Sequence, residues 1–274
     1  MAPPRIAVVT GVARRHGIGH AIAALLRETG YRVIGIDRRP AEEGTIWLDA
    51  PAPAAAAVAG PRSAAAAGTA APPPPPPPAR LLQLDLSDPA AIAELPRRLG
   101  PGPVHLLVCN AGVADPHLPA APPGAPGRAA AFAEFLQVNL AAPFLLTEAL
   151  APLMPAGDAA IVNIASTRAR QSEPNCEGYA ASKGGLEALT HAQAASLAGV
   201  ARVNCICPGW IDTSGQPESL RPEDHEWHWT GRVGRPSDVA ELAAFLADGS
   251  RSGFITGQSF VVDGGVSRRM AYPE

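Results

Sequence analysis

The sequence predicts an α/β fold, a single domain over residues 1–274 built on a doubly wound parallel sheet of about seven strands. Two features lead to this prediction. Short apolar runs alternate with longer helical stretches, which is typical of parallel strands joined by helical crossovers. The runs are almost continuously apolar, as expected of strands that helices cover on both faces. Such folds bind ligands at the carboxyl ends of their strands.

The expected elements alternate along the chain. The strands are the apolar runs 5–10, 31–37, 81–86, 104–110, 159–165, 201–207 and 259–265. The helices lie between them, at 19–30, 88–99, 129–154, 178–198 and 236–247.

One segment interrupts this alternation. Residues 50–79 are almost entirely alanine and proline, with seven consecutive prolines from Pro72 to Pro78. A segment with so little large apolar surface predicts a disordered insertion at the surface of the domain. Two functions remain open for it: a tolerated loop, or a ligand for a proline-binding domain.

The composition limits the class of protein. The chain is 47% hydrophobic and carries a net charge of -3, which gives no reason to expect nucleic acid or a membrane as partner. Its four cysteines, without a secretory signal, predict a cytoplasmic protein with reduced thiols. Cys205 and Cys207 have no second cysteine pair at metal-site spacing, so we expect no metal.

The first strand end indicates a dinucleotide site. Gly11, Gly17 and Gly19 lie between a strand and a helix, where glycines let the backbone approach a pyrophosphate. Asp37 follows 20 residues after Gly17, at the end of the second strand, where a carboxylate can accept hydrogen bonds from both ribose hydroxyls. Asp37 could also simply cap a loop. However, the strand, the glycine turn, the helix and the acid at the end of the next strand together favour dinucleotide binding.

Tyr179 and Lys183 stand four residues apart in a helical stretch, as neighbours on one face. The spacing alone leaves open whether the ammonium stabilises a phenolate. Further motifs occur in order along the chain: "TG…GIG" (10–19), "LDLSD" (84–88), "CNAG" (109–112), "QVNL" (137–140), "NIAST" (163–167), "YAASK" (179–183) and "CPGWIDT" (207–213). With these motifs the chain resembles the short-chain dehydrogenase/reductase family, from Arg5 to about Gly265. The turn between Gly11 and Gly17 is longer than the common family form.

The resemblance implies a Rossmann-like, NAD(P)-dependent oxidoreductase that transfers hydride between a nicotinamide cofactor and a secondary alcohol or ketone. Tyr179 would be the acid/base, and Lys183 would stabilise its phenolate and hold the nicotinamide ribose. Ser166 would polarise the reacting oxygen. Asn139 would hold the water through which protons leave. The individual alternatives are an interfacial tyrosine, a solvated lysine, a strand-end serine and a helix-capping asparagine.

The family's cofactor contacts carry over residue by residue. They are Gly11, Gly17, Ile18, Gly19, Asp37, Asp85, Leu86, Asn110, Ala111, Gly112, Tyr179, Lys183, Pro208, Gly209, Ile211 and Thr213. Asp37 favours NAD, because a carboxylate repels a 2′-phosphate. Arg14, Arg15 and Arg38 favour the alternative, NADP, because guanidinium groups could clamp that phosphate. We expect NAD.

The substrate site should lie between the loop 166–179 and a lid at 214–231, with Trp227 and Trp229 as covers. Arg168, Arg170, Gln171, Glu173, Asn175 and Glu177 make that loop polar, which predicts a small polar alcohol such as a sugar, polyol or hydroxy acid. A 3-oxoacyl-carrier-protein reductase is the alternative within the family. A non-catalytic dinucleotide-binding sensor or a scaffold is the alternative outside it. The resemblance also implies a homodimer or homotetramer.

Overall fold

A seven-stranded, entirely parallel sheet forms the centre of the molecule. The computed structural model describes residues 4–47, 78–113, 115–119 and 124–270, so all but the last two residues of the predicted insertion at 50–79 lie outside the described part. The strand order is β3-β2-β1-β4-β5-β6-β7. The strands are β1 (Ile6–Thr10), β2 (Arg32–Asp37), β3 (Arg80–Gln83), β4 (Val104–Cys109), β5 (Ala159–Ile164), β6 (Ala201–Pro208) and β7 (Ser259–Val262). This arrangement confirms the predicted fold class.

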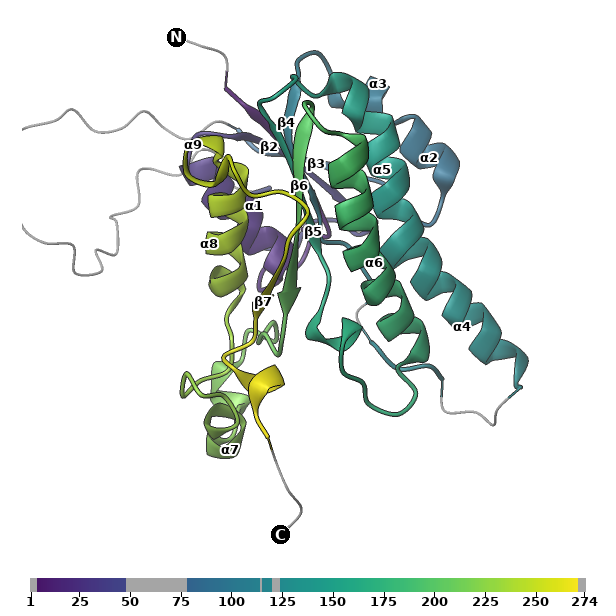
Figure 1. Cartoon of the computed structure of the whole chain (residues 1–274), viewed down its shortest axis with the longest axis vertical. Helices are drawn as coiled ribbons and strands as arrows, with labels where there is room; N and C mark the ends of the chain where they lie inside the picture. Colours follow the sequence, from purple (N-terminus) through teal and green to yellow (C-terminus); the bar gives the residue numbers. More distant parts are fainter. Residues whose placement is uncertain (1–3, 48–77, 114, 120–123, 271–274) are drawn as a thin grey trace, which may run out of the picture.

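Helices cover both faces of the sheet (Figure 1). On one side lie α1 (Ile18–Glu28), α8 (Pro236–Ala247) and α9 (Gly249–Ser252). On the other lie α2 (Pro89–Ala93), α3 (Leu95–Leu99), α4 (Pro126–Leu136), α5 (Ala142–Leu150) and α6 (Glu177–Ser196). A short helix, α7 (Pro222–Glu226), lies beyond the lower end of the sheet.

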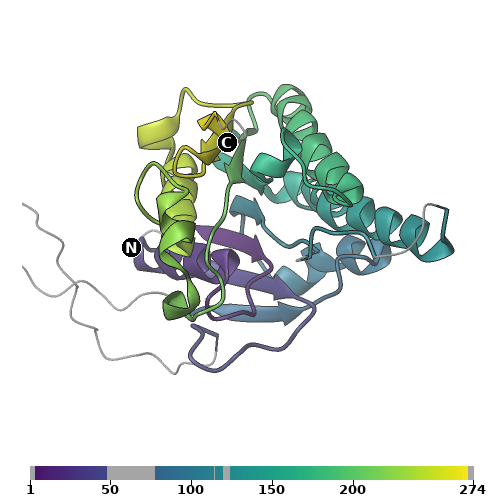
Figure 2. The same cartoon turned by 90° about the horizontal axis from the view of Figure 1, so that it is seen from below.

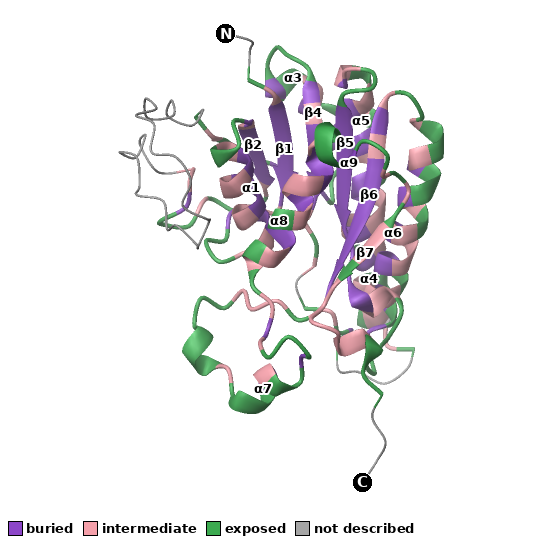
Figure 3. Ribbon diagram, turned by 60° about the vertical axis from the view of Figure 1, so that its left-hand side comes forward, coloured by how far each residue is buried: buried purple, intermediate pink, exposed green. Residues whose placement is uncertain are grey.

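The continuous apolar strands are explained by two separate cores. Ile6 and Val8 of β1 pack into the core beneath α2, α3 and α5, whereas Ala7 and Val9 pack into the core beneath α1 and α8. Successive side chains of a strand point to opposite faces, so a strand covered on both sides needs apolar residues at every position. Figure 3 shows the strands buried and the outer helix faces exposed.

Two helical stretches differ in detail from the prediction. The stretch 88–99 is divided at Glu94 into α2 and α3. Pro96 lies just beyond that break and has no N–H to donate to the preceding turn, which accounts for the interruption. The stretch 129–154 is one rod, but a π-helical turn, Gln137–Ala141, separates α4 from α5. Such turns often occur at functional sites, and this one contains Asn139.

One helical run in the described part, Gly127–Leu153, is long and apolar enough to cross a membrane by length and composition, with a mean hydropathy of 1.5. Leu146 and Leu150 of this run are buried in the core against the sheet. Packing in the domain therefore accounts for part of its apolar character. Phe132 and Phe144 of the same run remain exposed at its surface.

The carboxyl ends of the strands meet at the lower end of the sheet, which Figure 2 views from below. The order of the strands reverses between β1 and β4. The chain adds β2 and β3 on one side of this pair and β5 to β7 on the other. Ligands of open α/β sheets bind at such a point. The turns after β1, β4, β5 and β6 all start at this end.

Candidate active site

The turn between β1 and α1 brings backbone close to backbone. Gly11 adopts φ +71°, and a Cβ at this position would lie 2.8 Å from the Cα of Ala111. Gly17 is the N-cap of α1, and no side-chain cap forms there within the described chain. The first N–H groups of α1 are therefore suited to an anionic ligand, which the positive end of the helix dipole also attracts.

Thr10 and Asn110 tie β1 to β4 beneath this turn. The Asn110 side chain donates from Nδ2 to the carbonyls of Thr10 (2.9 Å) and Gly11 (3.0 Å). The Thr10 hydroxyl accepts from the backbone N–H groups of Asn110 and Ala111 at 3.0 and 2.9 Å. Asn110 thus shapes the glycine turn through its amide. Thr10 was not among the predicted site residues, although it begins the motif "TG…GIG" at the end of the first strand.

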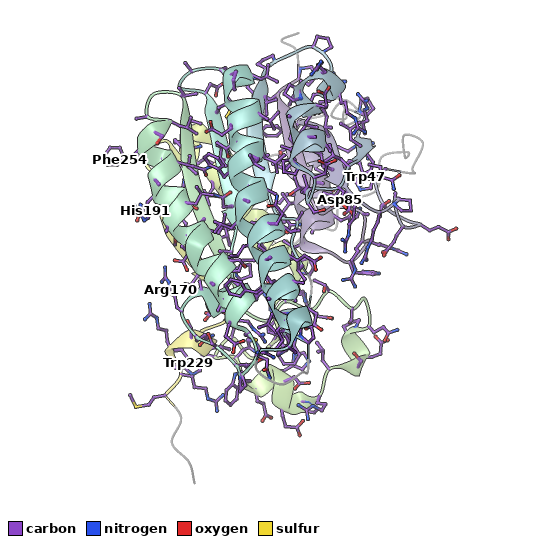
Figure 4. The ribbon with its side chains drawn as sticks, turned by 90° about the vertical axis from the view of Figure 1, so that its right-hand side faces the viewer. Trp47, Asp85, Arg170, His191, Trp229 and Phe254 are labelled. Carbon is purple, nitrogen blue, oxygen red and sulfur yellow. The ribbon has the colours of Figure 1, made fainter. Side chains whose placement is uncertain are left out.

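A cavity of about 250 Å³ opens beside the glycine turn. Ten of the predicted cofactor residues line it together: Gly11, Gly17, Ile18, Asp37, Asp85, Leu86, Asn110, Ala111, Gly112 and Thr213. The Asp37 carboxylate accepts from the N–H groups of Ala13 (2.9 Å) and Arg39 (3.0 Å), which holds it at the end of β2. The Ser87 N–H donates to Asp85 and lowers the pKa of that carboxyl. Figure 4 labels Asp85 beside Trp47.

Three arginines also line this cavity: Arg14, Arg38 and Arg39. Arg39 was not among the predicted phosphate clamps, although it follows Arg38 directly at the end of β2. Arg15 does not line the cavity, because its backbone N–H donates to Glu42 and its guanidinium packs against Gly44. Three guanidinium groups and three carboxylates, those of Asp37, Asp85 and Glu134, therefore line the same cavity.

A second cavity, of about 790 Å³, continues from the first. The two cavities share Ile18, Asn110, Gly112, Val113 and Thr213 on their walls. Ser166, Tyr179 and Lys183 all line the second cavity, as do Pro208, Gly209 and Ile211. Three of the four predicted catalytic residues and the predicted nicotinamide contacts therefore surround one space, which adjoins the cavity beside the glycine turn.

Helix α6 holds Tyr179 and Lys183 on one face. The Lys183 Nζ lies 5.7 Å from the centre of the Tyr179 ring and donates to the Ile164 carbonyl at 2.8 Å. Only 4% of Lys183 is exposed, so the backbone bond compensates for burying its charge. Ser166 follows β5, and its Oγ accepts from the Arg168 N–H at 3.1 Å, leaving its own hydroxyl proton free to orient.

Asn139 and Gly19 line neither cavity. The fully buried Asn139 accepts at Oδ1 from the Val113 N–H (2.9 Å) and donates from Nδ2 to the Ser182 hydroxyl (3.1 Å). That hydroxyl donates in turn to the Tyr179 carbonyl at 2.8 Å. A hydrogen-bonded chain thus runs from the loop after β4 to the backbone of Tyr179. The predicted role of Asn139 in holding a water remains a prediction.

The loop after β5 supplies only part of the expected pocket wall. Arg168, Gln171 and Glu173 line the larger cavity, whereas Arg170, Asn175 and Glu177 do not. Arg170 pairs instead with Glu187 of α6, with Nε 3.1 Å from Oε2. Of the two predicted covers, Trp227 lines the cavity, but Trp229 does not and is 65% exposed (Figure 4). Trp229 packs on Gly265, near the C-terminal end of the described chain.

The chain is similar to known proteins in both sequence and fold. A family model described as enoyl-(acyl carrier protein) reductase matches residues 54–267. An uncharacterized oxidoreductase of Thermotoga maritima is 37% identical, with both chains covered completely. A solved apo SCOR enzyme of Clostridium thermocellum is 31% identical with a TM-score of 0.75, covering 98% of this chain and 95% of its own. The chain belongs to the short-chain dehydrogenase/reductase family.

A dehydrogenase named for its substrate is also similar to this chain over nearly the whole length of both proteins. The cis-4-hydroxycyclohexanecarboxylate dehydrogenase of Sinomonas cyclohexanicum is 33% identical, covering 95% of this chain and 96% of its own. Members of the short-chain dehydrogenase/reductase family are oxidoreductases that bind NAD(P). The joined cavities fit such a cofactor, because the uncapped α1 N-terminus and the close approach at Gly11 leave a place for its pyrophosphate.

One group of side chains in the described part could hold a metal ion by spacing alone. One ligand atom from each of His117, Glu173 and Cys176 lies within 4.8 Å of the others. However, Arg168 already fills this place, with Nη2 2.8 Å from Glu173 and Nη1 3.2 Å from the Cys176 sulfur. The guanidinium neutralises the carboxylate that a metal would need, so this cluster is better explained as an ion pair at the rim of the larger cavity.

Proposed function

We propose that the protein transfers hydride between NAD and a small polar secondary alcohol or ketone, with Tyr179 as the acid/base. The observation that carries this proposal is the placement of Ser166, Tyr179 and Lys183 around one cavity that continues into the glycine-turn cavity. A dinucleotide-binding sensor would not need the three together.

The bound nicotinamide supplies or accepts the hydride at the substrate carbon. For oxidation, the Tyr179 phenolate takes the proton of the substrate hydroxyl, and for reduction the phenol returns it. The buried Lys183 ammonium lies beside the acid/base, with Nζ 5.7 Å from the centre of the Tyr179 ring. The Ser166 hydroxyl donates to the reacting oxygen and stabilises its developing charge. Asn139 keeps Tyr179 in place through Ser182.

For the cofactor we propose NAD. Asp37 is held by two backbone N–H groups at the end of β2 and lines the cavity that we propose for the adenosine part of the cofactor. The three arginines of the same cavity support NADP instead. A fixed carboxylate repels a 2′-phosphate at every approach, whereas exposed arginine side chains must lose conformational freedom to clamp one.

For the substrate we propose a sugar, polyol or hydroxy acid. Arg168, Gln171, Ser172 and Glu173 give the larger cavity a polar wall. The relative that acts on cis-4-hydroxycyclohexanecarboxylate supports a polar secondary alcohol. A carrier-protein reductase is the second candidate, supported by the description of the family model. Its acidic partner calls for a basic patch, yet α6 after Lys183 contains no arginine or lysine.

We further propose a cytoplasmic homodimer or homotetramer assembled through α4, α5 and α6. An open groove of about 770 Å³ lies between these helices, and its apolar lining includes Leu136, Leu140, Phe144 and Leu189. A second copy of the chain would bury this surface. The insertion at 50–79 is proposed to lie outside the catalytic machinery, since no candidate site residue falls within it.

A panel assay tests the proposed function. The purified protein is incubated with each alcohol and NAD or NADP, or with the oxoacyl thioester and NADH or NADPH, and the absorbance of the reduced nicotinamide is followed. The panel contains cis-4-hydroxycyclohexanecarboxylate, its methyl ester, a hexose, a polyol and a 3-oxoacyl thioester. Turnover of a polar secondary alcohol with NAD is expected. Turnover of the thioester alone would favour the carrier-protein reductase, and no turnover of any compound would contradict the hydride-transfer proposal.

A further inference from the structure

The larger cavity carries an excess of positive charge. Among the described residues that line it, Arg168, Lys183 and Arg269 are cationic and Glu173 is anionic. Two positive charges are therefore unbalanced next to the place proposed for the substrate. A neutral sugar or polyol would leave this charge uncompensated, whereas an anionic substrate would be attracted by it.

Two of the three cations are already engaged. Arg168 pairs through Nη2 with Glu173 at 2.8 Å, and its Nη1 lies 3.2 Å from the Cys176 sulfur. Lys183 donates to the Ile164 carbonyl and belongs to the proposed catalytic trio. Arg269 therefore remains as the cation that could recognise a substrate group away from the reacting carbon.

Arg269 is held so that one edge of its guanidinium stays open. Its Nη1 donates to the carbonyls of Glu226 (3.2 Å) and Trp227 (3.1 Å), at the end of α7. The guanidinium also stacks on the Trp227 ring, 4.4 Å from the ring centre. These contacts fix the plane of the group and leave Nε and Nη2 for other acceptors. Within the described part of the chain, no carboxylate lies within the 4.0 Å of an ion pair with Arg269.

The geometry of this open edge selects its ligand. The Nε–H and Nη2–H bonds of an arginine point the same way and match the two oxygens of a carboxylate. Stacking on an aromatic face and bonding to two carbonyls orient the group in advance, so little side-chain entropy is lost when an anion binds.

Building on the proposed hydride transfer, we propose that Arg269 binds a substrate carboxylate and determines specificity for hydroxy acids and their keto acids over neutral alcohols. The carboxylate forms a bidentate pair with Nε and Nη2, and the secondary alcohol of the same molecule lies toward Ser166 and Tyr179. The simplest competing role for Arg269 is structural, as a clamp between the C-terminal segment and α7.

The test compares a carboxylate with its neutral ester in three variants. Arg269→Gln removes both the charge and the paired Nε–H and Nη2–H donors, whereas Arg269→Lys keeps a charge without the paired donors. Arg268→Gln is the matched control, because Arg268 is exposed and does not line the cavity. For each, kcat and KM are measured with cis-4-hydroxycyclohexanecarboxylate and with its methyl ester. Arg269→Gln should raise KM for the acid about 10- to 100-fold with a small change in kcat, and should raise KM for the ester much less. Arg269→Lys should recover part of the loss.

Binding of cyclohexanecarboxylate to the enzyme–NAD complex, measured by calorimetry, tests the carboxylate site without any turnover. Binding by the wild type and Arg268→Gln, and loss of binding in Arg269→Gln, supports the site even if no alcohol is oxidised, in which case only the proposed function fails. Equal turnover of acid and ester by the wild type would overturn the proposal. So would an equal loss for both in Arg269→Gln, which is the result of a structural clamp, or the absence of any carboxylate binding.

Discussion

The chain of hydrogen bonds from Asn139 through Ser182 to Tyr179 makes a specific prediction about Ser182→Ala. The Ser182 hydroxyl is fully buried, accepts from Asn139 at 3.1 Å and donates to the Tyr179 carbonyl at 2.8 Å. Alanine fits the space, so the substitution removes one oxygen and creates no clash. It leaves the Asn139 amide with a donor that has lost its partner in a buried site.

The magnitude follows from these contacts. A buried donor left without a partner costs about 1–3 kcal/mol, and the lost bond to the Tyr179 carbonyl adds about 1 kcal/mol. The free energy of unfolding should therefore fall by about 2–4 kcal/mol. For a protein of this size each kcal/mol lowers Tm by about 2–4 °C, so Tm should fall by about 4–16 °C.

The assay is thermal and urea unfolding of the wild type, Ser182→Ala and a control, Ser196→Ala. Ser196 lies on the same helix and its hydroxyl donates to the Ala192 carbonyl at 3.1 Å, but it is exposed and has no role in the chain. The control should change the unfolding free energy by less than about 0.5 kcal/mol. If Ser182→Ala is as stable as the control, the argument that this buried chain holds Tyr179 in place is wrong.

Three other changes test separate parts of the structure. Asp37→Ala should weaken NAD binding by about 10- to 100-fold and shift preference toward NADP, because it removes acceptors for the ribose hydroxyls; a wild type that already prefers NADP in binding assays would contradict the NAD proposal. The Arg232 side chain, 2.7 Å away, lowers the pKa of Asp238 from its ordinary value of 3.8, so this pair stabilises the fold at neutral pH and the contribution is lost as pH falls through the lowered pKa. Asp238→Asn should therefore lower the free energy of unfolding in urea at neutral pH but not in strong acid. An equal loss at both pH values would show that the ionised carboxylate of Asp238 does not stabilise the fold. Phe144→Glu places a charge on a half-exposed residue of the proposed interface and should yield a monomer in light scattering, whereas a monomeric wild type would refute the assembly.

The elements predicted most accurately are those whose first and last residues are marked by particular residue types in the sequence. Helix α8 occupies Pro236–Ala247, as predicted, because Pro236 starts it and the Asp238 carboxylate accepts from the Arg235 N–H. The strands were recognisable because both faces are covered, which leaves a continuous apolar run. Strand β3 ends three residues earlier than predicted, at Gln83, although buried leucines continue the apolar pattern beyond it. An apolar run in the sequence indicates that residues are buried, but it does not show which of them pair with a neighbouring strand.

The site was predictable where residue type and position suffice, and less so where tertiary contacts decide. Tyr179 and Lys183 share a face because helix geometry places them there. The π-helical turn at Asn139 contacts α6, and no local pattern in the sequence indicates this turn. Trp229 was expected to cover the substrate, but side-chain direction in an irregular lid is set by neighbours such as Gly265. Arg269 lies outside every motif, so only its stacking on the lid revealed it.

The most direct test of the account is the turnover of Tyr179→Phe with the best substrate of the panel. The ring and its edge contact with Phe135, at 6.0 Å between centres, are retained, so the fold and cofactor binding should survive. Loss of the acid/base should lower kcat by at least about 100-fold. Cofactor affinity measured by fluorescence should be unchanged in the same sample. A variant that binds NAD normally and keeps most of its turnover would contradict the proposed role of Tyr179 in hydride transfer.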